Sequence, residues 1–403
     1  MCFSALNCLN ATATFFEVNK MITEIKNGTV LSGGKEEKRP VFFENGKITD
    51  AKKADRIIDA SGKYVSAGFI DLHIHGGDGY DFMDGTVEAF EKIAAFHALH
   101  GTTAMCPTGL SGSVEETVMM INAYKEVLKK ERTGADFLGI HLEGPYFALS
   151  KKGAQDPKYV HSPIKEEYEE ILKAADGNIV RWSAAPEVDT DFLFAKRMKE
   201  EGIIVSAGHT DADFYQTTES FKHGYSLMTH FYCAMSTVFR LNGVRQAGAV
   251  EAAYLNNDID VEIIADGMHL PLPLLKMIHK FKGSDRVALI TDAMRGAGSP
   301  DGSFSVLGSL DNGQKVRIVD GVAKLMDSET FAGSVATCDR LVRNMVAAGV
   351  SIADAAKMAS ATPARILGSK TKGLLEKGFD ADIVIFDGNV NVSDVFVRGK
   401  KIK

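Results

Sequence analysis

The sequence predicts an α/β protein: a (β/α)8 barrel of the TIM type, flanked by a small β-sandwich built from both ends of the chain. Two observations predict this fold. Through the middle of the chain, eight short apolar runs alternate with segments of helical periodicity, and eight parallel strands with crossover helices close into a barrel. Near the start of the chain, short alternating segments are broken by Asn-Gly and Ser-Gly turns, which are typical of strands joined by tight turns, and similar alternating segments recur near its end.

Composition narrows the class of protein. The chain has 403 residues, a net charge of −7 and 45% hydrophobic residues, which suffices for one large core. The acidic balance argues against a protein that binds nucleic acid or an anionic membrane, since such proteins carry basic surfaces. No apolar run approaches the roughly 20 residues that a membrane span requires. We therefore expect neither nucleic acid nor membrane as a partner.

The cysteines and the first residues bear on the compartment. Five cysteines, an odd number without a C-x-x-C pair, exclude a disulfide framework or a zinc ribbon and fit a reducing compartment. Residues 1–20 lack the basic and apolar regions of a secretion signal. We predict that they form an N-terminal extension that can be disordered.

A small antiparallel β domain is predicted from residues 21–68 together with residues 365–403. The first part holds the short strand-like segments 27–32, 40–48 and 56–62. The second part has segments of similar pattern at residues 381–386 and 395–400. Neither part can bury a core alone, so we expect the two to pair.

Residues 69–364 are predicted to form the barrel. Its strands are expected at Phe69–His75, Thr102–Pro107, Phe137–Glu143, Val180–Ala185, Ile203–His209, Ser226–His230, Val261–Asp266 and Val287–Asp292. Helical spacing is clear from Val87 to His97, where Gly101 follows as a C-terminal cap signal. Thr362 and Pro363 predict the N-cap and first turn of a late helix.

Chemically active residues fall at the ends of the predicted strands. Barrel active sites lie at the carboxyl ends of the strands, so these side chains should converge at one mouth. His73 and His75 point the same way because side chains alternate along a strand. Imidazoles and carboxylates favour a divalent metal such as zinc, iron or manganese. The residues concerned are His73, His75, Glu143, His209, His230 and Asp292.

A plainer interpretation exists for each histidine alone, because a lone histidine in an apolar segment is usually a core or surface residue. Six histidines are interpreted in that way: His97, His100, His141, His161, His223 and His279. His141 precedes Glu143 by two residues and could point inward. Coincidence does not account for four histidines and two acids that all end barrel strands, so we predict a metal-dependent hydrolase.

An ordered set of motifs resembles one enzyme family. Gly68-Phe-Ile-Asp-Leu-His-Ile-His75 resembles the opening motif of the amidohydrolase superfamily. Over roughly residues 22–403, the later motifs resemble the N-acetylglucosamine-6-phosphate deacetylase family, in the same order and spacing. They are His141-Leu-Glu-Gly-Pro145, Lys152-Gly-Ala-Gln155, Ser206-Ala-Gly-His209, Thr229-His230, Ala265-Asp-Gly-Met-His269, Thr291-Asp292 and Phe331-Ala-Gly-Ser334.

The resemblance implies roles for residues. It implies hydrolysis of the acetamide of N-acetylglucosamine 6-phosphate by a cytoplasmic homodimer with one or two divalent metal ions per chain. Glu143, His209 and His230 match the principal metal ligands, while His73 and His75 match the pair that completes a second site. Asp292 matches the catalytic acid and base. The positions that match substrate-contacting residues are Ala154, Gln155, Cys233, Ala234, Arg240, Arg245, Asp266, Gly267, His269, Phe331, Ala332 and Gly333.

Mechanistically, Asp292 is expected to take a proton from water and pass it to the leaving nitrogen. His269 or Gln155 is expected to help hold the oxyanion.

Three departures from the family pattern bear on the substrate. Cys233 stands where the family has asparagine, and some members have histidine in place of Gln155. The usual arginine-glutamate-proline stretch is replaced by Arg240-Leu-Asn-Gly-Val-Arg245. Arginine suits a phosphate dianion because its planar fork contacts two oxygens at once. We expect one of these two arginines to contact the phosphate, and Arg240 lies nearer to the family spacing.

Two other functions stay open. The chain could be another amidohydrolase that acts on a related N-acyl amine or cyclic amide. It could instead be a catalytically dead barrel that serves as a scaffold, although every metal ligand of the pattern is retained.

Overall fold

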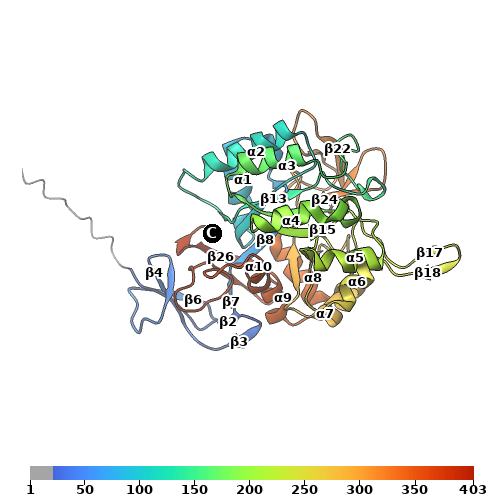
Figure 1. The fold of residues 1–403 in the computed structure, drawn as a ribbon. Helices are drawn as coiled ribbons and strands as arrows, with labels where there is room; N and C mark the ends of the chain where they lie inside the picture. Colours follow the sequence, from blue (N-terminus) through green and yellow to red (C-terminus); the bar gives the residue numbers. More distant parts are fainter. Residues whose placement is uncertain (1–20) are drawn as a thin grey trace, which may run out of the picture.

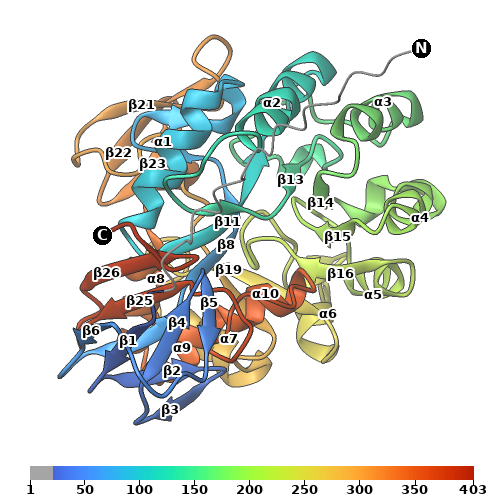
Figure 2. The ribbon, with the colours of Figure 1, turned by 90° about the vertical axis from the view of Figure 1, so that its left-hand side faces the viewer.

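The structure, a computed structural model, describes residues 21–403, so the predicted extension over residues 1–20 lies outside the described part. At its centre, eight parallel strands form a barrel (Figure 2). Each predicted apolar run overlaps one of these strands, so the predicted barrel is confirmed. In chain order they are β8 (Phe69–Ile74), β11 (Thr102–Gly109), β13 (Ile140–Glu143), β14 (Ile179–Ala184), β15 (Ile204–Ala207), β16 (Tyr225–Met228), β19 (Asp260–Ile264) and β20 (Val287–Ile290).

The barrel closes between its last and first strands. Strands β20 and β8 approach each other, and main-chain hydrogen bonds join the end of β8 and the residues after it to the segment that follows β20. Asp292 N donates to His73 O at 2.9 Å, and His75 N donates to Ala293 O at 2.8 Å. The barrel therefore closes through main-chain contacts of His73, His75 and Asp292, which the sequence predicts to lie at the mouth of the barrel.

Helices cover the outside of the barrel (Figure 2). The predicted helix at residue 87 begins after Thr86, whose hydroxyl accepts from Ala89 N at 3.2 Å, and ends before Gly101 at φ +91°. The ten α-helices within residues 21–403 are α1 (Val87–Ala98), α2 (Val114–Val127), α3 (Lys165–Ala175), α4 (Leu193–Glu200), α5 (Phe214–Lys222), α6 (Ala249–Leu255), α7 (Leu272–Lys282), α8 (Cys338–Ala347), α9 (Ile352–Met358) and α10 (Ala361–Ile366). None of them combines the length and the apolar character that crossing a membrane would require.

The late helix α10 differs from its predicted start. It begins at Ala361 after Ser360, two residues earlier than expected. The Thr362 hydroxyl donates to Ser284 O at 2.6 Å instead of capping the helix, so this side chain ties α10 to the segment before β20.

Two sheets lie beside the barrel. A four-stranded sheet holds β1 (Thr23–Lys26), β4 (Val41–Glu44), β5 (Lys47–Thr49) and β6 (Arg56–Asp59). A six-stranded sheet joins both parts of the chain through β2 (Thr29–Ser32), β3 (Lys35–Glu37), β7 (Tyr64–Ala67), β25 (Ile383–Phe386), β26 (Val392–Val397) and β27 (Lys400–Lys401).

The two sheets share one core but are not purely antiparallel. Ile25, Val65, Ile385 and Phe396 belong to a single buried cluster, which both sheets contribute to. Strand β1 pairs with β6 in parallel, and so does β2 with β7, because the links between these strands are long enough to cross over. Helix α10 spans the predicted boundary after residue 364, and the division of the chain into domains stays a prediction.

Further strands extend from the barrel and were not predicted. A four-stranded antiparallel sheet follows β20 and comprises β21 (Phe304–Leu307), β22 (Gln314–Val319), β23 (Val322–Leu325) and β24 (Phe331–Ser334). The hairpin of β17 (Phe239–Leu241) and β18 (Val244–Gln246) projects away from the barrel, at the right of Figure 1. Short strands complete the set: β9 (Gly76–Gly77), β10 (Tyr80–Asp81) and β12 (Asp136–Phe137).

Candidate active site

Three of the polar side chains in the barrel mouth follow a strand by two residues and have a left-handed backbone. His209 has φ +47°, His230 has φ +29° and Asp292 has φ +49°. Side chains other than glycine rarely adopt this conformation, and such residues cluster at functional sites. The turn in the backbone directs each side chain into the mouth of the barrel instead of along the wall.

The first group of potential metal ligands comprises Glu143, His209 and His230, whose ligand atoms lie within 4.8 Å of one another. Glu143 Oε1 lies 3.0 Å from His209 Nε2 and 2.9 Å from His230 Nε2. His209 Nδ1 donates to Lys151 O at 2.8 Å. Because Nδ1 carries the proton in that arrangement, Nε2 presents a lone pair to a metal ion.

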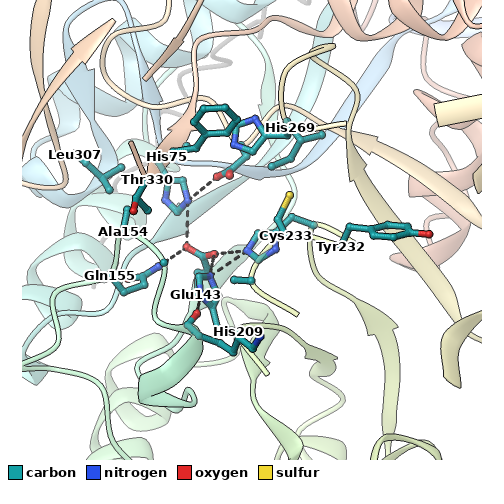
Figure 3. Close-up of a pocket in the computed structure, with 18 of the residues that line it drawn as sticks. His75, Glu143, Ala154, Gln155, His209, Tyr232, Cys233, His269, Leu307 and Thr330 are labelled. Atoms are coloured by element: carbon teal, nitrogen blue, oxygen red, sulfur yellow. Dashed lines mark hydrogen bonds and ion pairs between the residues drawn. The ribbon is translucent and has the colours of Figure 1, made fainter. Parts of the chain in front are cut away.

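The second group comprises His73, His75 and Asp292. Asp292 Oδ1 lies 3.4 Å from His73 Nε2 and 3.2 Å from His75 Nε2. His75 Nδ1 faces Thr108 O at 3.2 Å, which again leaves Nε2 for the mouth. The two groups adjoin, since His75 Nε2 also lies 3.3 Å from Glu143 Oε2 (Figure 3).

The charges of the site depend on these contacts. Burial alone would raise the pKa of Glu143, but the field of His73 and the close contacts with the rings of His209 and His230 hold it well below its ordinary value. Burial opposes protonation of His75, yet its hydrogen bonds to Asp292 and Glu143 raise its pKa to about 10. His75 thus holds a proton between the carboxylates of Asp292 and Glu143. Carboxylate and imidazole donors arranged in this way fit a divalent cation, which binds with release of such a proton.

The sheet of β21 to β24 supports Asp292 from behind. Ser334 N donates to Asp292 O at 2.7 Å, and Met294 N donates to Ser334 O at 2.9 Å. Gly333 permits this approach: its φ is +68°, and a Cβ there would lie 2.9 Å from Asp292 O. Asp292 therefore keeps its left-handed backbone because β24 is docked against it.

Gln155 connects Glu143 to the loop after β11. Its Nε2 donates to Glu143 Oε2 at 2.7 Å, and its Oε1 accepts from Ser111 N at 3.0 Å. Both ends of the amide are therefore used, and Gln155 contacts Oε2 of Glu143 while His209 contacts Oε1 (Figure 3).

His269 is held by a turn that begins at Asp266. Asp266 Oδ1 accepts from the main-chain nitrogens of Met268 and His269, each at 2.8 Å, and Asp266 Oδ2 lies 2.8 Å from His269 Nδ1. Burial would raise the pKa of Asp266, but these bonds to His269 lower it. The His269 ring also packs edge-on against Phe331 at 4.8 Å.

These side chains line a cavity of about 530 Å³ in the mouth of the barrel. Most predicted site residues border it: His75, Glu143, Ala154, Gln155, His209, His230, Cys233, Ala234, His269, Asp292, Phe331 and Gly333. Lining residues that the sequence did not indicate include Lys151, Tyr232, Leu307, Glu329 and Thr330. Leu307 is the last residue of β21, and Glu329 and Thr330 lie between β23 and β24; Figure 3 labels Leu307 and Thr330. These strands lie outside the barrel and were not predicted, so the barrel pattern could not have indicated the three residues.

Other predicted site residues do not border the cavity. Asp266 and Gly267 lie behind His269, while Ala332 is fully buried in the core of the added sheet. Arg240 and Arg245 are exposed on the β17–β18 hairpin, where they lie opposite each other. Neither arginine borders the cavity of its own chain, because the segment forms a projecting hairpin, and the contact of one of them with phosphate stays a prediction.

Buried polar residues, among them His141, Arg181, Ser183 and Glu262, lie next to the potential ligands. The sequence pattern did not indicate Arg181 and Glu262, and it favoured a core position for His141. The His141 ring lies 4.6 Å from that of His73, and its Nε2 contacts Ser183 Oγ at 2.8 Å. Arg181 and Glu262 form a fully buried ion pair across the barrel. Charged residues within otherwise apolar parallel strands are the signal that could have revealed this pair.

Comparisons with known proteins agree with the geometry. The family model "Amidohydrolase family" matches residues 64–402. An N-acetylglucosamine-6-phosphate deacetylase from Lysinibacillus sphaericus is 31% identical over 93% of this chain and 96% of its own. An N-acetylgalactosamine-6-phosphate deacetylase from Escherichia coli O157:H7 is 30% identical over 85% and 89%. A mutant N-acetyl-D-glucosamine-6-phosphate deacetylase from Mycobacterium smegmatis, solved with N-acetyl-D-glucosamine-6-phosphate, superposes with a TM-score of 0.84 at 29% identity, over 95% of this chain and 99% of that chain.

Proposed function

The chain belongs to the amidohydrolase family and is a hydrolase, and we propose that it removes the acetyl group from N-acetylglucosamine 6-phosphate. The products are glucosamine 6-phosphate and acetate. The observation that carries this proposal is the convergence of Glu143, Asp292, His75, His209 and His230 on one cavity, with His73 in the same ligand group as His75 and Asp292.

One or two divalent ions, of zinc, iron or manganese, are proposed as cofactors. Glu143, His209 and His230 would hold the first, and His73, His75 and Asp292 would hold the second. Mixed nitrogen and oxygen donors suit these metals. When bound, such an ion polarises the amide carbonyl and makes water acidic enough to supply hydroxide near neutral pH.

Asp292 is proposed as the residue that moves the proton. Despite burial, the fields of His73 and His75 and a hydrogen bond with His75 lower the pKa of Asp292, so its carboxylate is ionised and able to accept. A carboxylate oxygen of Asp292 takes a proton from the attacking water and returns it to the amide nitrogen as the C–N bond breaks. Without that proton the amine would leave as an unstable anion.

His269 and Gln155 are proposed to bind the substrate. Since Asp266 takes the Nδ1 side of His269, Nε2 is the ring nitrogen that can reach the acetamide oxygen or the sugar. Gln155 and Ala154 border the same space. Donors fixed in this way before the reaction stabilise charge that develops on the carbonyl oxygen.

Phosphate recognition is proposed to involve a second copy of the chain. Arg240 and Arg245 lie opposite each other and exposed, and like charges in that arrangement repel unless an anion lies between them. Val238, Phe239, Leu241 and Val244 expose apolar side chains on the same hairpin, which suits a protein contact. In a homodimer, the hairpin of one protomer would bring an arginine to its partner's cavity.

A cytoplasmic location is proposed as well. The three cysteines within residues 21–403 are free thiols, as in proteins of reducing compartments.

Acetate release tests the proposed reaction directly. The purified, metal-loaded protein is assayed with N-acetylglucosamine 6-phosphate, its galactosamine epimer and unphosphorylated N-acetylglucosamine. We expect the highest kcat/KM for the first. A preference for the epimer, which a 30%-identical relative is named for, would move the assignment to that sugar. No acetate from any of the three would reject the proposal.

A further inference from the structure

The ring of His73 has one nitrogen whose role is unexplained. Its Nε2 faces the cavity side, 3.1 Å from His75 Nε2 and 3.4 Å from Asp292 Oδ1. Its Nδ1 is buried and has no hydrogen-bond partner within residues 21–403. If Nε2 binds a metal ion, Nδ1 must carry the proton of the neutral imidazole. A buried N–H without an acceptor is costly, so an acceptor is expected nearby.

The side chain next to that atom is Glu262. Its Oε2 lies 3.8 Å from His73 Nδ1, which is about 1 Å beyond a hydrogen bond. Glu262 belongs to β19 and is fully buried, as is His73. His75 and His209 face main-chain carbonyls with their Nδ1 atoms, so at His73 a carboxylate stands where those two rings have a carbonyl.

Arg181 explains why Glu262 is itself not a metal ligand. The guanidinium of Arg181 contacts both carboxylate oxygens of Glu262, with Nη2 to Oε2 at 2.6 Å. Arg181 also donates to Leu72 O at 3.2 Å and to Ser206 Oγ at 3.1 Å. The bidentate pair neutralises the charge of Glu262 and holds its oxygens beneath the ring of His73.

We propose that Glu262, fixed by Arg181, is a positioning residue that accepts the Nδ1 proton of His73 and so sets the affinity of the His73–His75–Asp292 metal site. This inference rests on the proposed metal-dependent function. A carboxylate behind a ligating histidine fixes the tautomer and the ring orientation and makes the ligand more basic. Through Glu262, strand β19 thereby affects the metal affinity of a site to which it contributes no ligand.

Zinc titration of the metal-free protein tests this role without any substrate. Loss of such a partner weakens metal binding by about 10- to 100-fold. We expect Glu262→Gln to weaken the second zinc equivalent to that extent and to leave the first unchanged. Ser206→Ala is the matched control, because it removes a hydrogen bond of Arg181 but none of His73, and it should bind both equivalents like the unmodified chain.

A second variant covers the case in which Glu262→Gln fails to fold with Arg181 unpaired. The double variant R181M/E262M removes both charges, and such replacements of buried ion pairs are often tolerated. It should show the same selective loss of the second equivalent. Histidine ¹⁵N spectra of the zinc-loaded protein should show a strongly hydrogen-bonded Nδ1 proton that disappears in His73→Ala and shifts upfield in Glu262→Gln.

Three results would overturn the inference. Unchanged binding of the second zinc in both variants would mean that Glu262 does not act on the site. Equal weakening of both equivalents would indicate general support of the barrel. If the unmodified chain binds a single zinc equivalent, the second site does not exist and the inference is wrong. If that one-metal protein still releases acetate, the proposed function stands.

Discussion

The side-chain amide of Gln155 lies against Glu143, with its nitrogen donating to Oε2 at 2.7 Å. Glu143 Oε1 faces His209 and His230, so the two oxygens of one carboxylate have separate partners. Because Gln155 holds Oε2, the other oxygen, Oε1, is directed toward His209 and His230. Residue 155 was expected to bind substrate, and this contact gives it a second role in orienting a metal ligand.

Gln155→Leu should therefore weaken the first metal site by about tenfold, the lower end for loss of such a contact. Zinc titration of the metal-free protein measures this change. Gln155→His restores a donor and should recover part of the affinity. Ser150→Ala, which alters another residue of the cavity lining, serves as control. Unchanged zinc affinity in Gln155→Leu would limit residue 155 to substrate binding.

Asp292→Asn should lower kcat by about 10²- to 10⁴-fold, the usual value of general acid–base catalysis. Asparagine keeps the shape of the side chain but cannot accept a proton. Because Asp292 also belongs to the second ligand group, metal content should fall at that site and persist at Glu143, His209 and His230. Asp320→Asn makes the same change at an exposed residue and should leave kcat unaltered. Turnover within threefold of the unmodified enzyme would end the assignment.

Replacing His73 and His75 together by alanine should abolish binding of a second metal equivalent. The first ligand group keeps all three of its members, so one equivalent should remain tightly bound. Elemental analysis after desalting measures both quantities. Finding one tight equivalent before and after the change would show that the histidine pair holds no metal.

The hairpin arginines should act across a dimer. Arg240→Ala with Arg245→Ala should raise KM for the 6-phosphate substrate by about 10- to 100-fold, the value of a charge-assisted contact, and should change KM less for the unphosphorylated sugar. Co-expression of this double variant with Asp292→Asn should restore activity, because one cavity of the mixed dimer is then complete. Activity no greater than the sum of the two variants would place phosphate recognition elsewhere.

His97 should make the protein less stable in mild acid. Its Nε2 donates to Gly76 O at 3.0 Å, and Nδ1 is buried with no partner within residues 21–403. Burial lowers the pKa of His97 from 6.5 to about 4. Between these values the unfolded chain binds a proton that the folded chain does not, so stability falls as pH drops through this window.

The expected loss from His97 is about 2 kcal/mol between pH 7 and pH 5. Urea unfolding of the metal-free protein at both values measures it. His97→Gln should reduce the pH dependence by that amount, whereas His223→Gln, at a half-exposed histidine, should not. Equal pH dependence with and without His97 would contradict this account.

Local patterns of the sequence were enough to predict the barrel. Most residues of the barrel strands are buried, so each strand is a short apolar run in the sequence, and the polar residue that ends it is found without knowledge of contacts. His73, His75 and Glu143 could be placed in this way, as could His209, His230 and Asp292 just beyond their strands. The rule that strand ends converge depends on topology and not on side-chain detail.

The hairpin and the added sheet could not be predicted in the same way. Strands β17 and β18 are exposed along nearly their whole length, so burial imposes no alternating pattern on them. For that reason the sequence did not show that Arg240 and Arg245 lie away from the cavity of their own chain. Strands β21 to β24 are only partly buried, and their contribution to the cavity depends on how they dock against Asp292.

The sequence by itself determined the barrel, the order of its strands and the polar residues that end them, because periodicity and strand ends are properties of the chain over a few residues. Only the tertiary structure decided which atoms meet: the division of the ligands into two groups, the amide of Gln155 on Glu143, and the ion pair of Arg181 and Glu262 beneath His73. Arg181 and Glu262 are 81 residues apart, and no local pattern relates them. Their pairing is fixed by the closure of the barrel, which brings β14 and β19 to face each other across a common interior.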